Sequence, residues 1–144
     1  MKVGESCRVS KRKPNTERFI HTYYCFRVDN YLQSQGYSPI REYGPKNEPI
    51  FSQTSEDGKL INILKRIDVY AEIDGCRIGY EITNSFSNLY TNIFKCLGLM
   101  KMDQVVIICE NQNRVKEAKE IIEKKKIPEY QKEKIKFIQI CEFL

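Results

Sequence analysis

Two alternating runs of apolar and polar residues, joined by Asp74-Gly75, constrain the fold of this chain more than any other feature of its sequence. In residues 67–73 isoleucine, valine and alanine alternate with acidic residues and tyrosine, and residues 76–82 alternate in the same way. Alternation is the period of a half-buried strand, and Asp-Gly between two such runs is a strong signal for a tight β-hairpin. The sequence therefore predicts two antiparallel, neighbouring strands.

The turn also sets the register of the two strands. If Asp74 and Gly75 are the loop residues, Asp68 lies directly across from Glu81. Side chains opposed in this way have Cβ atoms about 4.5–5.5 Å apart, and like charges there destabilise a sheet. A divalent cation would offset the repulsion, because Mg²⁺ is commonly held by one or two carboxylates together with substrate phosphate oxygens. The alternative is a solvated sheet face on which both acids point into water.

Helical and extended patterns alternate along the rest of the chain. Apolar residues at helical spacing predict helices, and short apolar runs predict strands. The expected elements besides the hairpin are a helix over 16–35, a strand over 37–43, a loop over 44–58, an ambiguous segment over 59–65, a helix over 87–101, a strand over 105–109, a helix over 113–126 and a strand over 135–141. Residues 105–109 are apolar throughout, as expected of a parallel strand buried on both faces. The prediction is an α/β fold.

Length and charge suggest how the chain is organised. Its 144 residues fit one domain, which we place at 15–144. Residues 1–14 contain five lysines and arginines against one glutamate, so we expect a basic, flexible arm suited to a phosphate backbone or simply solvated. No apolar run approaches the roughly 18 residues of a membrane span, and the first residues lack the apolar segment of a signal peptide. We expect an intracellular, cytoplasmic protein without a membrane partner.

The six cysteines include no Cys-x-x-Cys pair, so the usual spacing of a zinc site is absent. Four of them lie in apolar stretches of sequence: Cys25, Cys96, Cys109 and Cys141. Free cysteine is among the most buried residue types. We expect reduced, structural thiols, with disulfides as the alternative if the source is a hyperthermophile.

The expected order of helix, three strands, helix and strand resembles the αβββαβ core of the PD-(D/E)XK, or restriction-endonuclease-like, nuclease superfamily. Asp68 in the second strand and Glu81 in the third resemble the acids of that core. Glu17 and His21 resemble the first-helix acid and the neighbouring polar residue of many members. The resemblance covers about residues 16–110 and implies a mixed central sheet flanked by helices, here with a C-terminal αβ extension.

The third-strand signature of the superfamily is Glu-x-Lys, and here Thr83 stands at the lysine position. Some members carry the lysine on the following helix instead. Asn92 and Lys95, with Cys96-Leu97 after them, resemble that variant as it occurs in nuclease-like domains of mobile elements. Residues three apart are neighbours on a helix, so Asn92 and Lys95 should share a face. A Lys95 side chain that points away from the hairpin would indicate a binding-only member.

The resemblance implies roles for these residues. The expected ligands of Mg²⁺, or of Mn²⁺ in its place, are Asp68, Glu81 and the backbone carbonyl of Ile82. The expected groups around the scissile phosphate and the attacking water are Lys95, Asn92, Ser85, Glu17 and His21. The implied activity is metal-dependent endonucleolytic hydrolysis of phosphodiester bonds in nucleic acid, in DNA more than in RNA. Members of the superfamily often form homodimers, which we keep as a candidate state.

Ordinary structural roles are also open to several of these residues. His21 borders an apolar stripe, Glu17 suits a helix N-terminus through the helix dipole, and Lys95 could be a solvated lysine. A catalytically inactive nuclease-fold module that binds nucleic acid or a protein is the main alternative to an enzyme, and Thr83 favours it. A thioredoxin-like or other open α/β binding domain is the third candidate. The absence of Cys-x-x-Cys and of a glycine-rich phosphate loop argues against its redox and nucleotide-binding forms.

Overall fold

The computed structural model describes residues 15–44, 49–54, 58, 60–64 and 66–144, and for 15–17, 49–54 and 60–64 it describes the backbone alone. The predicted basic arm, residues 1–14, lies outside the described residues. The elements are, in chain order, α1 (Asn15–Ser34), β1 (Ile40–Tyr43), β2 (Pro49–Thr54), β3 (Leu60–Leu64), β4 (Ile67–Ile73), β5 (Cys76–Ile82), α2 (Leu89–Phe94), the π-helix η2 (Lys95–Leu99), β6 (Gln104–Cys109), α3 (Gln112–Glu123), α4 (Glu129–Lys132), β7 (Ile135–Gln139) and the 3₁₀-helix η3 (Ile140–Phe143).

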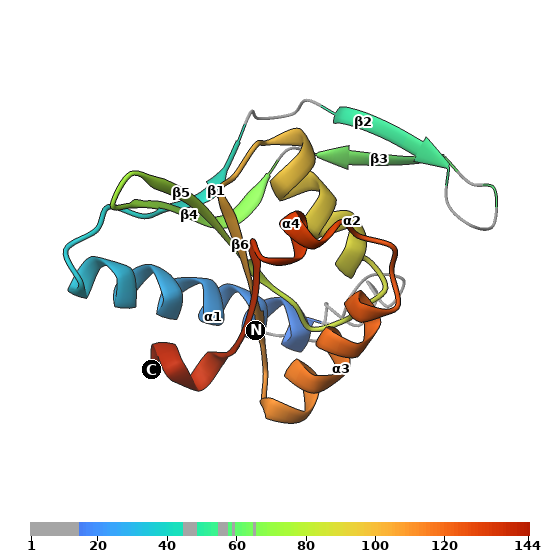
Figure 1. The fold of residues 1–144 in the computed structure, drawn as a ribbon. Coiled ribbons are helices and arrows are strands. Elements are labelled where there is room, and N and C mark those ends of the chain that lie inside the picture. The colour runs from blue at the N-terminus through green and yellow to red at the C-terminus, as the bar shows by residue number, and fades with distance from the viewer. Residues whose placement is uncertain (1–14, 45–48, 55–57, 59, 65) are drawn as a thin grey trace.

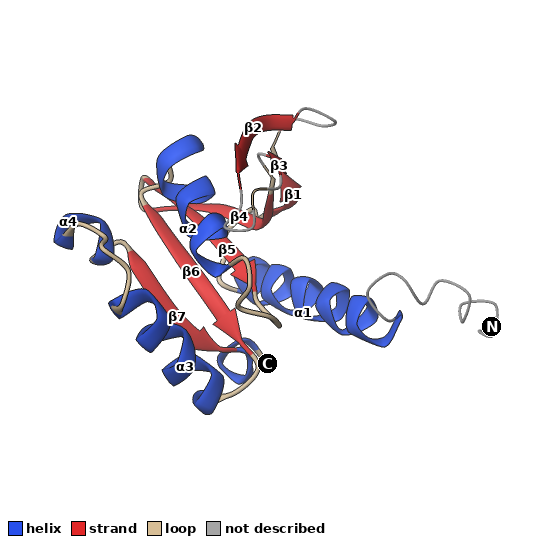
Figure 2. Ribbon diagram, turned by 90° about the vertical axis from the view of Figure 1, so that its right-hand side faces the viewer, coloured by secondary structure: helices blue, strands red, loops and turns tan. Residues whose placement is uncertain are grey.

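The fold is α/β, with a five-stranded mixed sheet in the order β1-β4-β5-β6-β7 (Figure 1). β4 pairs antiparallel with β1 and β5, whereas β6 pairs parallel with β5 and β7. One hydrophobic core joins the sheet to α1 and η3, and a second joins it to α2 and α3. Figure 2 shows these helices on the two faces of the sheet. The sheet is therefore covered on both sides, and the apolar strand β6 is buried as predicted.

The predicted hairpin is present in the predicted register. Ile73 pairs with Cys76 across the turn, and the ladder continues to Val69 and Tyr80. Asp74 and Gly75 have φ angles of 52° and 83°, the positive values that a type I′ turn requires at both loop residues. The regular pairs end one step before Asp68 and Glu81 would face each other.

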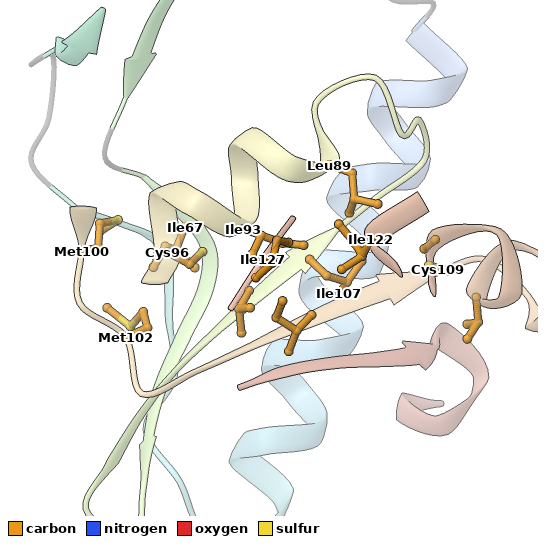
Figure 3. Packing of buried hydrophobic residues seen from close by; sticks show 14 of the residues in the cluster. Ile67, Leu89, Ile93, Cys96, Met100, Met102, Ile107, Cys109, Ile122 and Ile127 are labelled. Carbon is orange, nitrogen blue, oxygen red and sulfur yellow. The ribbon is translucent and has the colours of Figure 1, made fainter. Parts of the chain in front are cut away.

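The backbone is irregular at Asp68. Between the β1–β4 pairs Arg41↔Val69 and Tyr43↔Ile67 there is no pair at the step where Glu42 would face Asp68, and Glu42 has a φ of 52°. Ile67 consequently packs in the core on the α2 side, together with Cys96 (Figure 3), whereas Val69 packs in the core on the α1 side. The strict alternation of the sequence is thus broken where the hairpin approaches the candidate site.

The helix predicted over 87–101 is shorter and changes type. α2 ends at Phe94, and the chain continues as a π-helical turn over Lys95–Leu99. A π-turn inserted in a helix shifts the side chains that follow it around the axis, and such turns are frequent at functional sites. Lys95 and Cys96, at the start of this turn, are both buried.

Several sequence-based boundaries are wrong. β2 lies in the segment predicted as a loop, and the ambiguous segment 59–65 contains β3, which pairs antiparallel with β2. This pair forms a separate two-stranded sheet that projects from the main one (Figure 1). The first strand starts at Ile40 rather than residue 37, and the short helix α4 is absent from the sequence-based prediction. Turn residues flank β2, and proline is tolerated at the first position of a strand, so local signals did not reveal it.

The cysteines follow the prediction with one correction. Cys25, Cys96 and Cys109 are free and buried, whereas Cys141 is exposed because it lies in η3 rather than in the last strand. Cys76 is also free and exposed. Among the helices of the described residues, none combines the length and the apolar character needed to cross a bilayer.

Candidate functional site

A polar cavity of about 290 Å³ lies where β4 and β5 meet α1, α2 and η2. Most of the residues predicted for the site line it: His21, Asp68, Glu81, Ile82, Ser85, Asn92 and Lys95. Thr83, from the loop that follows β5, lines it as well. The structure thus brings together side chains that are far apart in the sequence.

The Asp68 carboxylate is held by the neighbouring strand and by α1. Its Oδ2 accepts a hydrogen bond from the backbone N–H of Ile82 at 2.9 Å. The Nε2 atom of His21 lies 3.2 Å from the same oxygen. The Asp68 side chain is 24% exposed, so it remains accessible from solvent. His21 therefore orients Asp68, a contact that no local sequence pattern predicts.

The Glu81 carboxylate is almost fully buried. Its Oε2 accepts a hydrogen bond from the Lys95 ammonium at 3.1 Å and a longer one from the backbone N–H of Asp68 at 3.4 Å. The Cys96 thiol lies 3.9 Å from the same atom. Burial raises the pKa of Glu81 to about 7, with a further increase from the Asp68 charge, while Lys95 acts in the opposite direction. Burial thus disfavours the ionised form of Glu81, and the ion pair with Lys95 favours it.

The two acids are neighbours, but each has its own partners. The N–H of Asp68 points to the Glu81 carboxylate, and the N–H of Ile82 points to the Asp68 carboxylate. Lys95 offsets the charge of Glu81, and His21 contacts the Asp68 carboxylate. The repulsion expected from the sequence is therefore offset in part by the protein itself.

Among the described contacts, one oxygen of each carboxylate accepts no hydrogen bond. The hydrogen bonds that the two side chains form within the described residues fall on Oδ2 of Asp68 and Oε2 of Glu81. Oδ1 and Oε1 have none among these contacts. Hard cations such as Mg²⁺ prefer oxygen ligands of this kind. The donor set therefore fits a divalent cation at this position.

Lys95 points toward the hairpin, as the variant of the family pattern requires. Its side chain is only 8% exposed, and it forms a buried ion pair with Glu81. Asn92, one helical turn earlier, lines the same cavity. Thr83, at the usual lysine position, is buried and donates a hydrogen bond to the backbone carbonyl of Glu81 at 3.4 Å. Thr83 is uncharged, so it does not supply the positively charged side chain that the lysine of a Glu-x-Lys motif would.

Three further residues were predicted for the site: Glu17, Ser85 and Ile82. Glu17 lies in α1, but its side chain is outside the described part of the structure. The Ser85 hydroxyl lies 3.2 Å from that of Ser87. Ile82 lines the cavity, and its N–H donates to the Asp68 carboxylate.

Sequence reasoning missed Cys25 as a neighbour of the site. Its thiol lies 3.8 Å from Nδ1 of His21, and burial raises its pKa to about 12. The spacing of four residues between His21 and Cys25 on a helix was the available signal. Cys25, His21 and Asp68 together have ligand atoms within 4.8 Å of one another.

Comparisons with known proteins add no assignment. No protein-family model matches the sequence, and no curated protein matches it significantly.

Proposed function

We propose that this chain is a metal-dependent endonuclease with a restriction-endonuclease-like core, which hydrolyses phosphodiester bonds in nucleic acid. The observation that carries the proposal is the 3.1 Å contact between the Lys95 ammonium and Glu81, in a cavity that Asp68 also lines. Two acids and one cation from three separate elements match the pattern that the sequence resembles. DNA is the first substrate to test.

Asp68 and Glu81 would hold Mg²⁺ or Mn²⁺ through the oxygens that carry no other described contact, together with the carbonyl of Ile82. A bound dication of this kind lowers the pKa of a coordinated water and offsets charge on a phosphoryl oxygen. The cavity, lined mainly by polar groups, provides room for a phosphate group beside these ligands.

The other side chains would position the substrate and the water. An ammonium has three N–H donors, and Lys95 has one described acceptor, Glu81. Its remaining donors can therefore stabilise the negative charge that develops on the scissile phosphate. His21 fixes the orientation of the Asp68 carboxylate. Asn92 and Ser85 add neutral polar groups along the same wall.

Cleavage of plasmid DNA, single-stranded DNA and RNA in Mg²⁺ or Mn²⁺ tests the proposal. Asp68→Asn and Glu81→Gln should each reduce the rate by roughly 100-fold or more, since each removes a charged ligand of the cation that would stabilise the transition state. Glu72→Gln is the matched control, because Glu72 is an exposed acid of the same strand as Asp68. Equal rates in the wild type, Asp68→Asn and Glu81→Gln would exclude this site as the source of cleavage.

The second candidate is a catalytically inactive module of the same fold that binds nucleic acid or a protein. Thr83 favours it, because this buried, neutral residue stands where a Glu-x-Lys motif has its lysine. Calorimetric titration with Mn²⁺ distinguishes the two functions. A nuclease should bind Mn²⁺, and the Asp68→Asn substitution should abolish this binding. An inactive module should bind an oligonucleotide but show no Mn²⁺ binding that depends on Asp68.

A further inference from the structure

A second cavity, of about 220 Å³, is lined by Asp68 but not by Glu81 or Lys95. Asp68 and His21 line both cavities. The other residues that line the second cavity come from α1, from β1 and from the start of β4: Thr22, Cys25, Arg41, Glu42 and Arg66. A water molecule occupies about 30 Å³ in the liquid, so this space is large enough for a phosphate group. Two arginines distinguish it from the first cavity.

Arg66 has a donor that the fold does not use. Its Nε is buried and has no hydrogen-bond partner in the described structure. Its Nη1 lies 3.7 Å from Glu42, whose side chain is 77% exposed, which makes this ion pair weak. A buried N–H without an acceptor costs free energy, so such a group requires a physical reason. The buried Nε is itself out of reach of a ligand, so an anion in the cavity would bind the terminal nitrogens of Arg66, whose described ion pair is the weak one with Glu42.

Arg41 is held in place beside it. Its Nε donates to Asp29 at 3.0 Å, and its guanidinium stacks on the ring of Phe26 at 4.0 Å from the centroid. None of the hydrogen bonds described for Arg41 uses its two terminal nitrogens. The planar fork of a guanidinium matches two oxygens of a phosphate. Because these contacts already fix the Arg41 guanidinium, binding an anion there should cost little further side-chain entropy.

We propose that this cavity binds a backbone phosphate of the nucleic acid, next to the phosphate that is cleaved, and that Arg66 is its main ligand. The inference rests on the proposed function, because it assumes that the scissile phosphate binds in the first cavity and that the neighbouring phosphate binds in the second. Asp68 lines both cavities. The charges that line the cavity are Arg41 and Arg66 against Glu42 and Asp68. Neutralising Asp68 leaves the cavity with net positive charge, so phosphate binding should strengthen when Asp68 binds a cation or becomes asparagine.

The test measures binding in the Asp68→Asn chain, without divalent cations, so that cleavage plays no part. Fluorescence anisotropy follows a labelled single-stranded 12-mer over a series of salt concentrations. Adding Arg66→Gln should weaken binding roughly tenfold, as expected for the loss of a hydrogen bond to a charged group. It should also reduce the magnitude of the negative slope of log affinity against log salt by about 0.7, the value for one phosphate contact on a single strand.

Lys119→Gln is the matched control, because Lys119 is an exposed lysine of α3 and its loss changes the net charge equally. It should leave both affinity and slope nearly unchanged. The same affinity and slope in the Arg66→Gln and Lys119→Gln chains would overturn the inference. Thermal unfolding of each variant excludes a general loss of folding, which is not expected because the ion pair of Arg66 in the described part of the chain is the weak one with Glu42.

A second arm separates an internal phosphate from a terminal or free one. The Arg66→Gln substitution should weaken the binding of oligonucleotides with and without a 5′-phosphate equally. Inorganic phosphate should compete only weakly with oligonucleotide binding. A dependence on Arg66 that appears only with the 5′-phosphate would overturn the proposal in favour of end recognition. Failure of the proposed function gives a different result, namely cleavage that is absent or independent of Asp68 while oligonucleotide binding still depends on Arg66.

Discussion

At the scale of single residues, the Glu81–Lys95 pair dominates the energetics of the site. Both side chains are less than 10% exposed and their charged atoms lie 3.1 Å apart. Removing one member of a buried pair leaves an uncompensated charge, which typically costs about 3–5 kcal/mol, whereas replacing both can be nearly neutral. The pair is therefore a weak source of stability but a strong constraint on substitution.

Substitution of Lys95 should make stability depend on pH. Without the ammonium, the pKa of Glu81 rises further above its ordinary value, because burial and Asp68 then act unopposed. A carboxyl whose pKa is raised by folding stabilises the folded state below its unfolded pKa and loses that contribution as the pH rises through the folded value. Lys95→Met should therefore lose up to about 1.4 kcal/mol of stability per pH unit between roughly pH 5 and pH 8.

Urea unfolding in EDTA at several pH values measures this effect. The double variant Glu81→Gln/Lys95→Met is the control, and it should recover most of the lost stability with a flat pH profile in this range. A pH profile of Lys95→Met that matches that of the double variant would contradict the assignment of the effect to Glu81.

At the scale of elements, the β4–β5 hairpin delivers both acids to the cavity. Its turn places Gly75 at a φ of 83°, and a Cβ added there meets no atom within 4 Å. The cost of a side chain is therefore backbone strain alone, about 1–2 kcal/mol for an L-residue in the left-handed region. Gly75→Ala should lower the free energy of unfolding by about that amount.

Asp74→Asn is the matched control for the turn, because asparagine also tolerates the left-handed conformation that Asp74 adopts at a φ of 52°. Its stability should differ little from that of the wild type. Urea midpoints of the two variants provide the comparison, and equal midpoints for Gly75→Ala and Asp74→Asn would show that the turn does not limit the stability of the hairpin.

At the scale of the whole molecule, a cation at Asp68 and Glu81 would bind across the β4–β5 hairpin, whose two acids also contact His21 of α1 and Lys95 of η2. A ligand that binds only the folded state adds about 2.7 kcal/mol at a concentration one hundred times its dissociation constant. Saturating Mn²⁺ should therefore raise the urea midpoint of the wild-type chain. The Asp68→Asn midpoint should not respond, and an equal response of the two chains would place Mn²⁺ binding elsewhere.

Local patterns in the sequence were sufficient to predict the elements that neighbouring residues determine. The Asp74-Gly75 turn fixes its own φ angles and the register of β4 and β5, and the apolar run of β6 identifies a buried parallel strand. α1 begins and ends within one residue of its prediction. These features follow from neighbouring residues, so a single sequence contains them.

Only the tertiary structure decided how the site is assembled. The irregular backbone at Asp68 lies where β4 pairs with β1, and Lys95 is buried in the π-helical turn that follows α2. The contact of His21 with Asp68 spans 47 positions of sequence. The arginine cavity likewise combines α1, β1 and the start of β4. Such contacts arise from the packing of distant segments, whose energies no local pattern records.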